Sequence, residues 1–77
     1  MVKKFFLVRM KYFNSGEITV TSEICESKSQ AMIKYYTYIE EDMEDNTLCG
    51  SSCTILNWLG ENVICNNWGT IVIEENV

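Results

Sequence analysis

The 77-residue sequence contains no histidine and no proline, and no basic residue follows Lys34. The missing histidine removes the usual general base, the commonest metal ligand and every catalytic triad that depends on imidazole. The sequence also lacks a P-loop and a G-x-G-x-x-G pattern, the usual phosphate-binding loops. These absences predict a protein that is not an enzyme and needs no cofactor.

Long hydrophobic runs are missing too. No stretch approaches the ~20 apolar residues of a membrane helix. Arg9 and Lys11 interrupt the apolar residues 5–8, which leaves that run too short for the core of a signal peptide. The hydrophobic fraction of 47% is ordinary for a globular protein, and the length suits one small domain, residues 1–77. We therefore expect a single cytoplasmic domain without membrane contact.

Positive charge is absent from the second half of the chain. Residues 1–34 contain all six basic residues and three acidic ones, whereas residues 35–77 contain eight acidic residues and none that is basic. The net charge is −5. This balance argues against direct binding of nucleic acid, which needs Lys and Arg on phosphates. It is compatible with a partner protein that has a basic surface, including one that normally holds nucleic acid.

Residues 27–45 have the pattern of a helix. Ser27 with Gln30 three residues later has the form of a capping box. Neighbouring tyrosines on a helix point apart, so Tyr36 or Tyr38 should be exposed. Lys28, Lys34, Glu41 and Asp42 lie off the apolar stripe. That stripe recurs at helical spacing and consists of Ala31, Met32, Tyr35, Ile39 and Met43.

Strand patterns flank this helix on both sides. We expect strands over residues 4–13, 17–25, 53–59 and 63–68, with 70–75 as a short fifth strand or a continuation of the fourth. Turns are expected at Asn14-Ser15-Gly16 and Gly60-Glu61-Asn62, and a loop over 46–52. The predicted fold is α+β: an antiparallel sheet of four to five strands with one helix packed on one face, in ββαββ order.

Two strands allow a prediction of their faces. Both faces of the first strand begin with apolar residues, so this strand is expected to be central in the sheet or covered on both sides. In the second strand, Ile18, Val20 and Ile24 are expected to face the core.

The cysteines and tryptophans leave alternatives open. Zinc sites usually contain repeated close pairs of cysteines, and here only Cys49 and Cys53 are near each other. We expect four reduced thiols, mostly buried, and no metal; a zinc site or disulfides are the alternatives. Trp58 and Trp68 flank the last predicted hairpin and serve either the core or a recognition surface. With a turn at Gly60-Glu61, one face would carry Leu56, Trp58, Ile64 and Trp68.

The predicted helix ends in a block of carboxylates. A helix C-terminus carries partial negative charge, so each carboxylate there is disfavoured by roughly 0.3–1 kcal/mol at low salt. The block is either a solvated face or a patch kept for a partner. Its members, with the neighbouring tyrosine, are the candidate partner-binding residues Glu40, Glu41, Asp42, Glu44, Asp45 and Tyr38.

Three features suggest a resemblance. Ser27 and Ala31 open the helix, a cysteine-containing apolar strand follows it at residues 53–58, and a Gly turn leads to a strand that ends in Asn67-Trp68. In this pattern the chain resembles the small ββαββ proteins encoded by phages and prophages of Gram-positive bacteria, although the acidic helix end and residues 69–77 depart from it. Proteins of this size, acidity and origin include anti-CRISPR and other anti-defence inhibitors.

The resemblance implies a non-enzymatic inhibitor in the host bacterial cytoplasm. The acidic helix end would occupy a basic surface of a bacterial defence protein. The alternative is a small homo-oligomeric structural or accessory protein, possible as a homodimer, in which the edge strand 70–75 pairs between chains.

Overall fold

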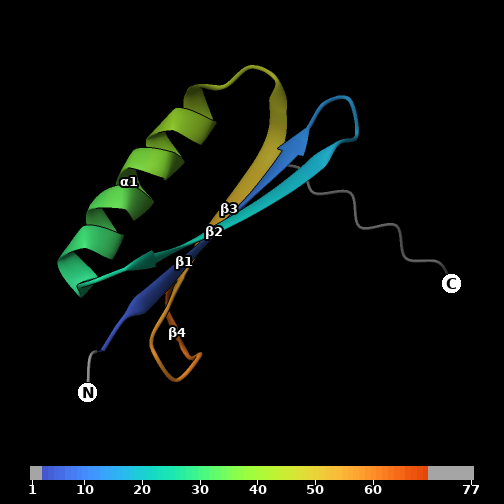
Figure 1. Ribbon diagram of the computed structural model, residues 1–77. Helices are drawn as coiled ribbons and strands as arrows, with labels where there is room; N and C mark the ends of the chain where they lie inside the picture. The colour runs from blue at the N-terminus through green and yellow to red at the C-terminus, as the bar shows by residue number, and fades with distance from the viewer. Residues whose placement is uncertain (1–2, 70–77) are drawn as a thin grey trace, which may run out of the picture.

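Two strands precede one helix and two strands follow it in the computed structural model, which describes residues 3–69 (Figure 1). This order confirms the predicted ββαββ arrangement of the α+β class. The predicted fifth strand, residues 70–75, lies outside the described residues. The elements are β1 Phe5–Phe13, β2 Ile18–Cys25, α1 Lys28–Glu44, β3 Leu48–Leu56 and β4 Asn62–Gly69.

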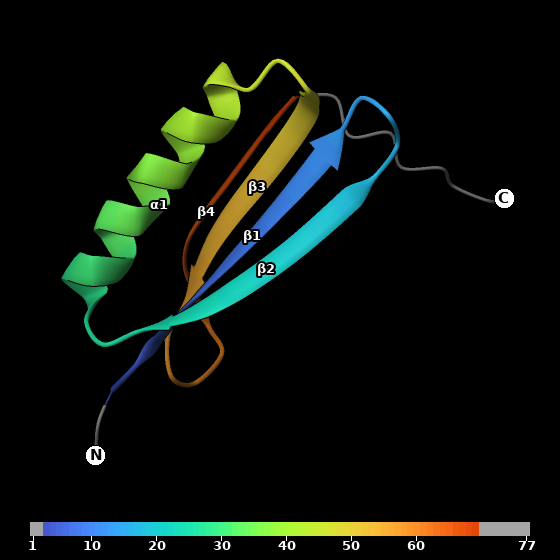
Figure 2. The same ribbon diagram turned by 45° about the horizontal axis from the view of Figure 1, so that its top comes forward.

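The four strands form one antiparallel sheet in the order β2-β1-β3-β4 (Figure 2). β1 is therefore central, which is one of the two positions predicted for it. Leu7 of β1 lies opposite Glu23 of β2 and Ile55 of β3. In both views α1 lies along one face of the sheet, so one face is covered by the helix and no described element covers the other (Figures 1 and 2).

The hairpin between β1 and β2 closes at the predicted turn. The Phe13 N–H donates to the Glu17 carbonyl at 2.9 Å, and the Gly16 N–H donates to the Phe13 carbonyl at 2.9 Å. Gly16 has φ +94°, a conformation that strains residues with a Cβ. Glycine at this position therefore allows the tight return of the chain.

Ser27 is the N-cap of α1, as predicted. Its hydroxyl accepts a hydrogen bond from the Gln30 N–H at 3.2 Å, which satisfies one of the free donors of the first turn. The Gln30 side chain accepts from the N–H of Glu26 at 3.1 Å, one residue before the N-cap. The capping box is thus half as predicted, because its second bond goes to Glu26 rather than to Ser27.

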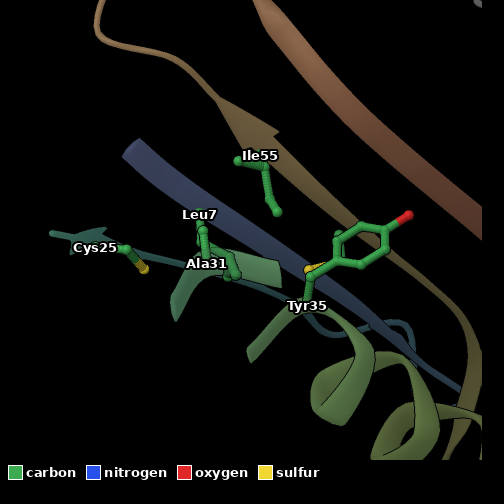
Figure 3. Close-up of a cluster of buried hydrophobic side chains, with 6 residues drawn as sticks. Leu7, Cys25, Ala31, Tyr35 and Ile55 are labelled. Carbon is green, nitrogen blue, oxygen red and sulfur yellow. The ribbon is translucent and has the colours of Figure 1, made fainter. Parts of the chain in front are cut away.

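The helix packs onto the sheet chiefly through Ala31 and Tyr35 (Figure 3). Ala31 and Tyr35 are buried, and Met32 and Ile39 pack against the buried cluster, as the stripe predicted. Met43 is 64% exposed, so its place in the stripe is wrong. The core cluster consists of Leu7, Cys25, Ala31, Tyr35, Cys53 and Ile55.

The predicted phase of β2 is wrong. Ile18, Val20 and Ile24 are 58–59% exposed and lie on the face away from the helix. Phe5 lies opposite Cys25, and the buried side of β1 continues into β2 through such pairs. A strand pattern of period two allows either phase, and pairing with β1 selects the one in which the apolar residues of β2 face outward.

β3 begins at Leu48, so the predicted loop over 46–52 is wrong from that residue on. Ser51 and Ser52 are buried within the strand. Their segment pairs with β1 on one side and with β4 on the other. The backbone N–H and C=O groups are therefore hydrogen-bonded within the sheet rather than to water. Small polar residues are therefore tolerated in a central strand here.

The last hairpin turns earlier than predicted. The Asn57 side-chain oxygen accepts from the N–H groups of Leu59 and Glu61, each at 2.9 Å, which closes the turn before the predicted Gly60-Glu61-Asn62. β4 ends at Gly69, whose φ is +86°. A Cβ at Gly69 would collide with the backbone of Cys49, so the close approach of the strands requires glycine.

Candidate functional site

An ion pair between Arg9 and Asp42 joins the sheet to the end of the helix. The Arg9 guanidinium donates two hydrogen bonds to the Asp42 carboxylate, from Nη2 to Oδ1 at 2.5 Å and from Nε to Oδ2 at 3.3 Å. The Asp42 side chain is only 1% exposed and that of Arg9 13%. The carboxylate predicted to lie off the buried stripe is therefore part of the helix–sheet interface, and that prediction is wrong.

Further groups surround this ion pair. Lys11 Nζ lies 4.0 Å from Asp42 Oδ1, and Glu41 Oε1 lies 3.6 Å from Arg9 Nη2. The guanidinium stacks over the Tyr38 ring at 4.3 Å, a cation–π arrangement. Burial alone would lower the pKa of Arg9, but the hydrogen bond and charge of Asp42 outweigh it and raise that pKa.

Tyr38 extends the network to β2. Its hydroxyl donates to Glu23 Oε2 at 2.8 Å, and Lys34 Nζ lies 2.6 Å from Glu23 Oε1. The hydrogen bonds from Lys34 and Tyr38 favour the ionised carboxylate and lower the pKa of Glu23. Because the hydroxyl is held by Glu23, the pKa of Tyr38 is raised. These charges are fixed in ion pairs under and beside the helix.

Four of the six predicted partner-binding residues are thus engaged within the chain, Glu41 through its ion pair with Arg9. Asp42 and Tyr38 belong to the network just described. Asp45 caps the end of α1, where its Oδ1 accepts from the Thr47 hydroxyl at 2.6 Å and the Thr47 N–H at 2.9 Å, and these bonds lower the Asp45 pKa. The other two, Glu40 and Glu44, are exposed at the helix end, and the Glu41 side chain is exposed there as well.

The four thiols are free and differ in exposure. Cys25 and Cys53 are buried, Cys49 is half-buried and Cys65 is exposed. Burial raises the pKa of Cys53 to about 11, so this thiol stays protonated at neutral pH. Among residues 3–69, no three Cys, Asp or Glu side chains gather in a group able to hold a metal ion.

The two tryptophans occupy different environments. Trp58 lies in the last turn and is 37% exposed. The Phe5 ring meets it edge-on with centroids 5.8 Å apart, and Lys3 Nζ lies 4.8 Å from its ring centroid. Trp68 lies in β4 and is half-buried. Trp58 therefore joins the turn to the beginning of β1.

The expected common face of the last hairpin is only partly correct, because Ile64 and Trp68 share the helix side of β4 and Leu56 does not. Ile64 lies opposite Ile55 and therefore on the helix side. Leu56 lies opposite Phe6, on the side away from the helix. A register shift between Ile55 and Leu56 and the early turn at Trp58 separate these residues. The predicted grouping failed because a bulge cannot be seen in residue spacing.

Comparison of the chain with protein-family models, with curated proteins and with solved structures finds no match. Within residues 3–69, no helix has the length and apolar character needed to cross a membrane. The functional argument therefore depends on the surfaces of the chain itself.

Proposed function

We propose that this chain is a non-enzymatic inhibitor that binds a basic surface of a bacterial protein through Glu40, Glu41 and Glu44. One observation carries the proposal: these three carboxylates remain exposed at the C-terminal end of α1 after Asp42 and Asp45 have entered internal contacts. The helix dipole adds partial negative charge at the same end, so the arrangement costs stability. A partner that supplies positive charge would offset that cost.

The charge of the chain supports this class of partner. The second half of the sequence has no basic residue, so Arg9 and Lys11 of β1 are the cations near the helix end among the described residues, and the net charge is −5. The carboxylates of the helix end would be complementary to Lys and Arg side chains on a partner, and this attraction would speed the association of the two proteins. The resemblance to phage-encoded inhibitors supports a bacterial defence protein in the host cytoplasm as the target, whereas direct binding to nucleic acid would bring like charges together.

The other members of the predicted set have a supporting role in this proposal. Asp42 fixes the last turn of α1 to Arg9, and Asp45 fixes the chain that leaves the helix. Tyr38 lies between Arg9 and Glu23. These contacts hold the outer carboxylates on a rigid element, which lowers the entropic cost of binding.

The first prediction tests the exposed carboxylates. A tagged wild-type chain is used to capture its target from a bacterial lysate, and binding of the purified target is then measured for the variant Glu40→Lys/Glu44→Lys. Glu41 is left unchanged because it lies near Arg9. We expect binding to be lost or severely weakened. Thermal melting should be unchanged or slightly improved, since positive charge suits a helix C-terminus.

The matched control carries the same change in net charge elsewhere. Glu17 and Glu61 are exposed in the two hairpin turns. The variant Glu17→Lys/Glu61→Lys should bind the target nearly as well as the wild type. Equal binding by both double variants and the wild type would show that the helix end is only solvated.

A further inference from the structure

The face of the sheet away from α1 is not covered by any described element (Figures 1 and 2), and its β2–β1 half is mostly apolar. Residues opposite each other in register share a face, and Val8 in the middle of β1 lies opposite Ser22 of β2 and Thr54 of β3. On this face Phe6 is 36% exposed and the three aliphatic residues of β2 are 58–59% exposed. Its large apolar residues are Phe6, Val8, Met10, Tyr12, Ile18, Val20, Ile24 and Leu56.

Charge is distributed between the two faces in an unusual way. The four strands contain only three charged residues: Arg9, Lys11 and Glu23. All three are on the helix side, since Arg9 pairs with Asp42 and the other two lie at positions of the same parity in the register. Antiparallel sheets with one free face normally direct polar residues to water on that face. Here the free face is neutral, which indicates that it is covered in solution.

The neutral character of this face argues for a second copy of the chain as its cover. Within the four strands, a partner recognised through charge finds no complementary group on this face. A second copy offers a neutral face, which covers the aliphatic residues without leaving a charge unpaired. Two chains of net charge −5 also meet here through the one sheet surface that contains no carboxylate.

The shape of the face is complementary to the same face of a second copy. The β2 edge carries protruding aliphatic side chains, whereas the β3–β4 half carries smaller or polar ones, including Ser52, Thr54, Cys65 and Asn67. A two-fold axis between two stacked sheets, parallel to the strands, places β2 of each copy over β4 of the other. The protruding aliphatic side chains of β2 in one copy then meet the smaller side chains of the β3–β4 half in the other.

The size of the face is close to what a dimer needs. Four strands at ~4.8 Å spacing and ~27 Å length cover roughly 500 Å² of flat area on each copy. The accessible surface of the protruding side chains is larger than this flat area. Two such faces therefore approach the ~1,200 Å² of total buried surface at which specific interfaces begin. The exposed apolar residues of the β2–β1 half form the kind of patch that commonly marks an interaction site.

We propose that the uncovered sheet face is the interface of a homodimer in which β2 of each copy lies over β4 of the other. The two helices would then lie on the outer surfaces of the dimer, away from the interface. This proposal goes beyond inhibitor function and does not depend on the acidic helix end. It also differs from pairing through residues 70–75, because faces rather than strand edges meet.

The second prediction tests this interface by mass. Light scattering of the full chain over a wide concentration range should show a monomer–dimer equilibrium. Ile24→Glu and Val20→Glu each place a charge on the face, and both should yield monomers. Ile33 is 68% exposed on the helix, so Ile33→Glu is a matched control that should remain dimeric. All three side chains are exposed in the monomer, so folding should be retained.

Cross-linking tests the orientation of the two copies. Ser22 and Cys65 belong to one row of the sheet, at opposite edges. In the proposed dimer, Ser22→Cys should be joined to Cys65 of the other copy by a short bifunctional thiol reagent. Thr21 lies next to Ser22 on the helix side, so Thr21→Cys should form no such link above the wild-type background.

Three results would overturn the proposal. The first is a wild-type mass that stays monomeric at every concentration. The second is a dimer that survives both face variants. The third is equal cross-linking to Cys65 by the Ser22→Cys and Thr21→Cys variants. Each result is independent of target binding, so failure here would leave the proposed inhibitor function untouched.

Discussion

At the scale of single residues, Asp42 shows how burial changes the meaning of a charge. Its carboxylate is 1% exposed and is held by both nitrogens of the Arg9 fork. This bidentate pair of hydrogen bonds compensates the cost of desolvating both ions, and removal of one partner leaves the other without its buried counterion. The energetic role of this residue therefore lies in the helix–sheet interface.

The third prediction follows from that burial. Asp42→Asn should destabilise the fold by roughly 3–5 kcal/mol, because Arg9 then loses its buried counterion and keeps only the exposed Glu41 nearby. The measurement is urea unfolding at neutral pH. Glu41→Gln is the control, since the Glu41 side chain is 56% exposed and its loss should cost less than about 0.5 kcal/mol.

A double variant distinguishes charge from shape. Arg9→Met/Asp42→Leu removes both ions and should recover most of the stability lost in Asp42→Asn. If Asp42→Asn and Glu41→Gln unfold at the same urea concentration, the buried ion pair contributes nothing measurable and the prediction fails.

At the scale of elements, the sequence predicted what local chemistry decides. Ser27 caps the helix and Gly16 closes the first hairpin, because each acts on backbone groups within a few residues. Exposure of Tyr36, at 60%, follows from helix geometry in the same way. These features need no knowledge of where the rest of the chain lies.

The features that the sequence did not predict depend on distant partners. Asp42 is buried because Arg9, 33 residues earlier, faces the same space, and no spacing signal joins the two. The phase of β2 is set by pairing with β1, and apolar alternation alone favoured the opposite face for Val20. β3 begins at Leu48 because pairing with β1 and β4 provides hydrogen-bond partners for the backbone of this segment.

The fourth prediction concerns the contact of α1 with the sheet. Ile39 is half-buried against the core, whereas Met43, four residues later, is 64% exposed. Ile39→Ala should cost about 2 kcal/mol, the low end for truncation of a large aliphatic residue, because its burial is partial. Met43→Ala should cost less than about 0.5 kcal/mol. Urea unfolding of both variants checks this pair; equal losses would mean that the last turns of α1 are rotated relative to the sheet.

At the scale of the whole molecule, the two proposed surfaces follow different physics. The outer helix end contains Glu40 and Glu44 without a cation within 4 Å among the described residues. The uncovered sheet face contains no charged residue. Salt screens interactions between exposed charges that are farther apart than the Debye length, which is about 10 Å at ~0.1 M and about 3 Å at ~1 M. Salt does not weaken apolar burial.

The fifth prediction therefore separates the surfaces by ionic strength. Raising salt from about 0.05 M to about 0.5 M should weaken target binding, because the shorter Debye length screens the attraction between the helix-end carboxylates and the basic groups of the target. The same change should leave the dimer intact or favour it, since salt screens the repulsion between two chains of net charge −5. Target titrations and light scattering at both salt concentrations measure the two effects on one sample. A dimer that dissociates with salt would place ion pairs in its interface, contrary to the neutral sheet face. Target binding that ignores salt would remove the helix-end carboxylates from the contact.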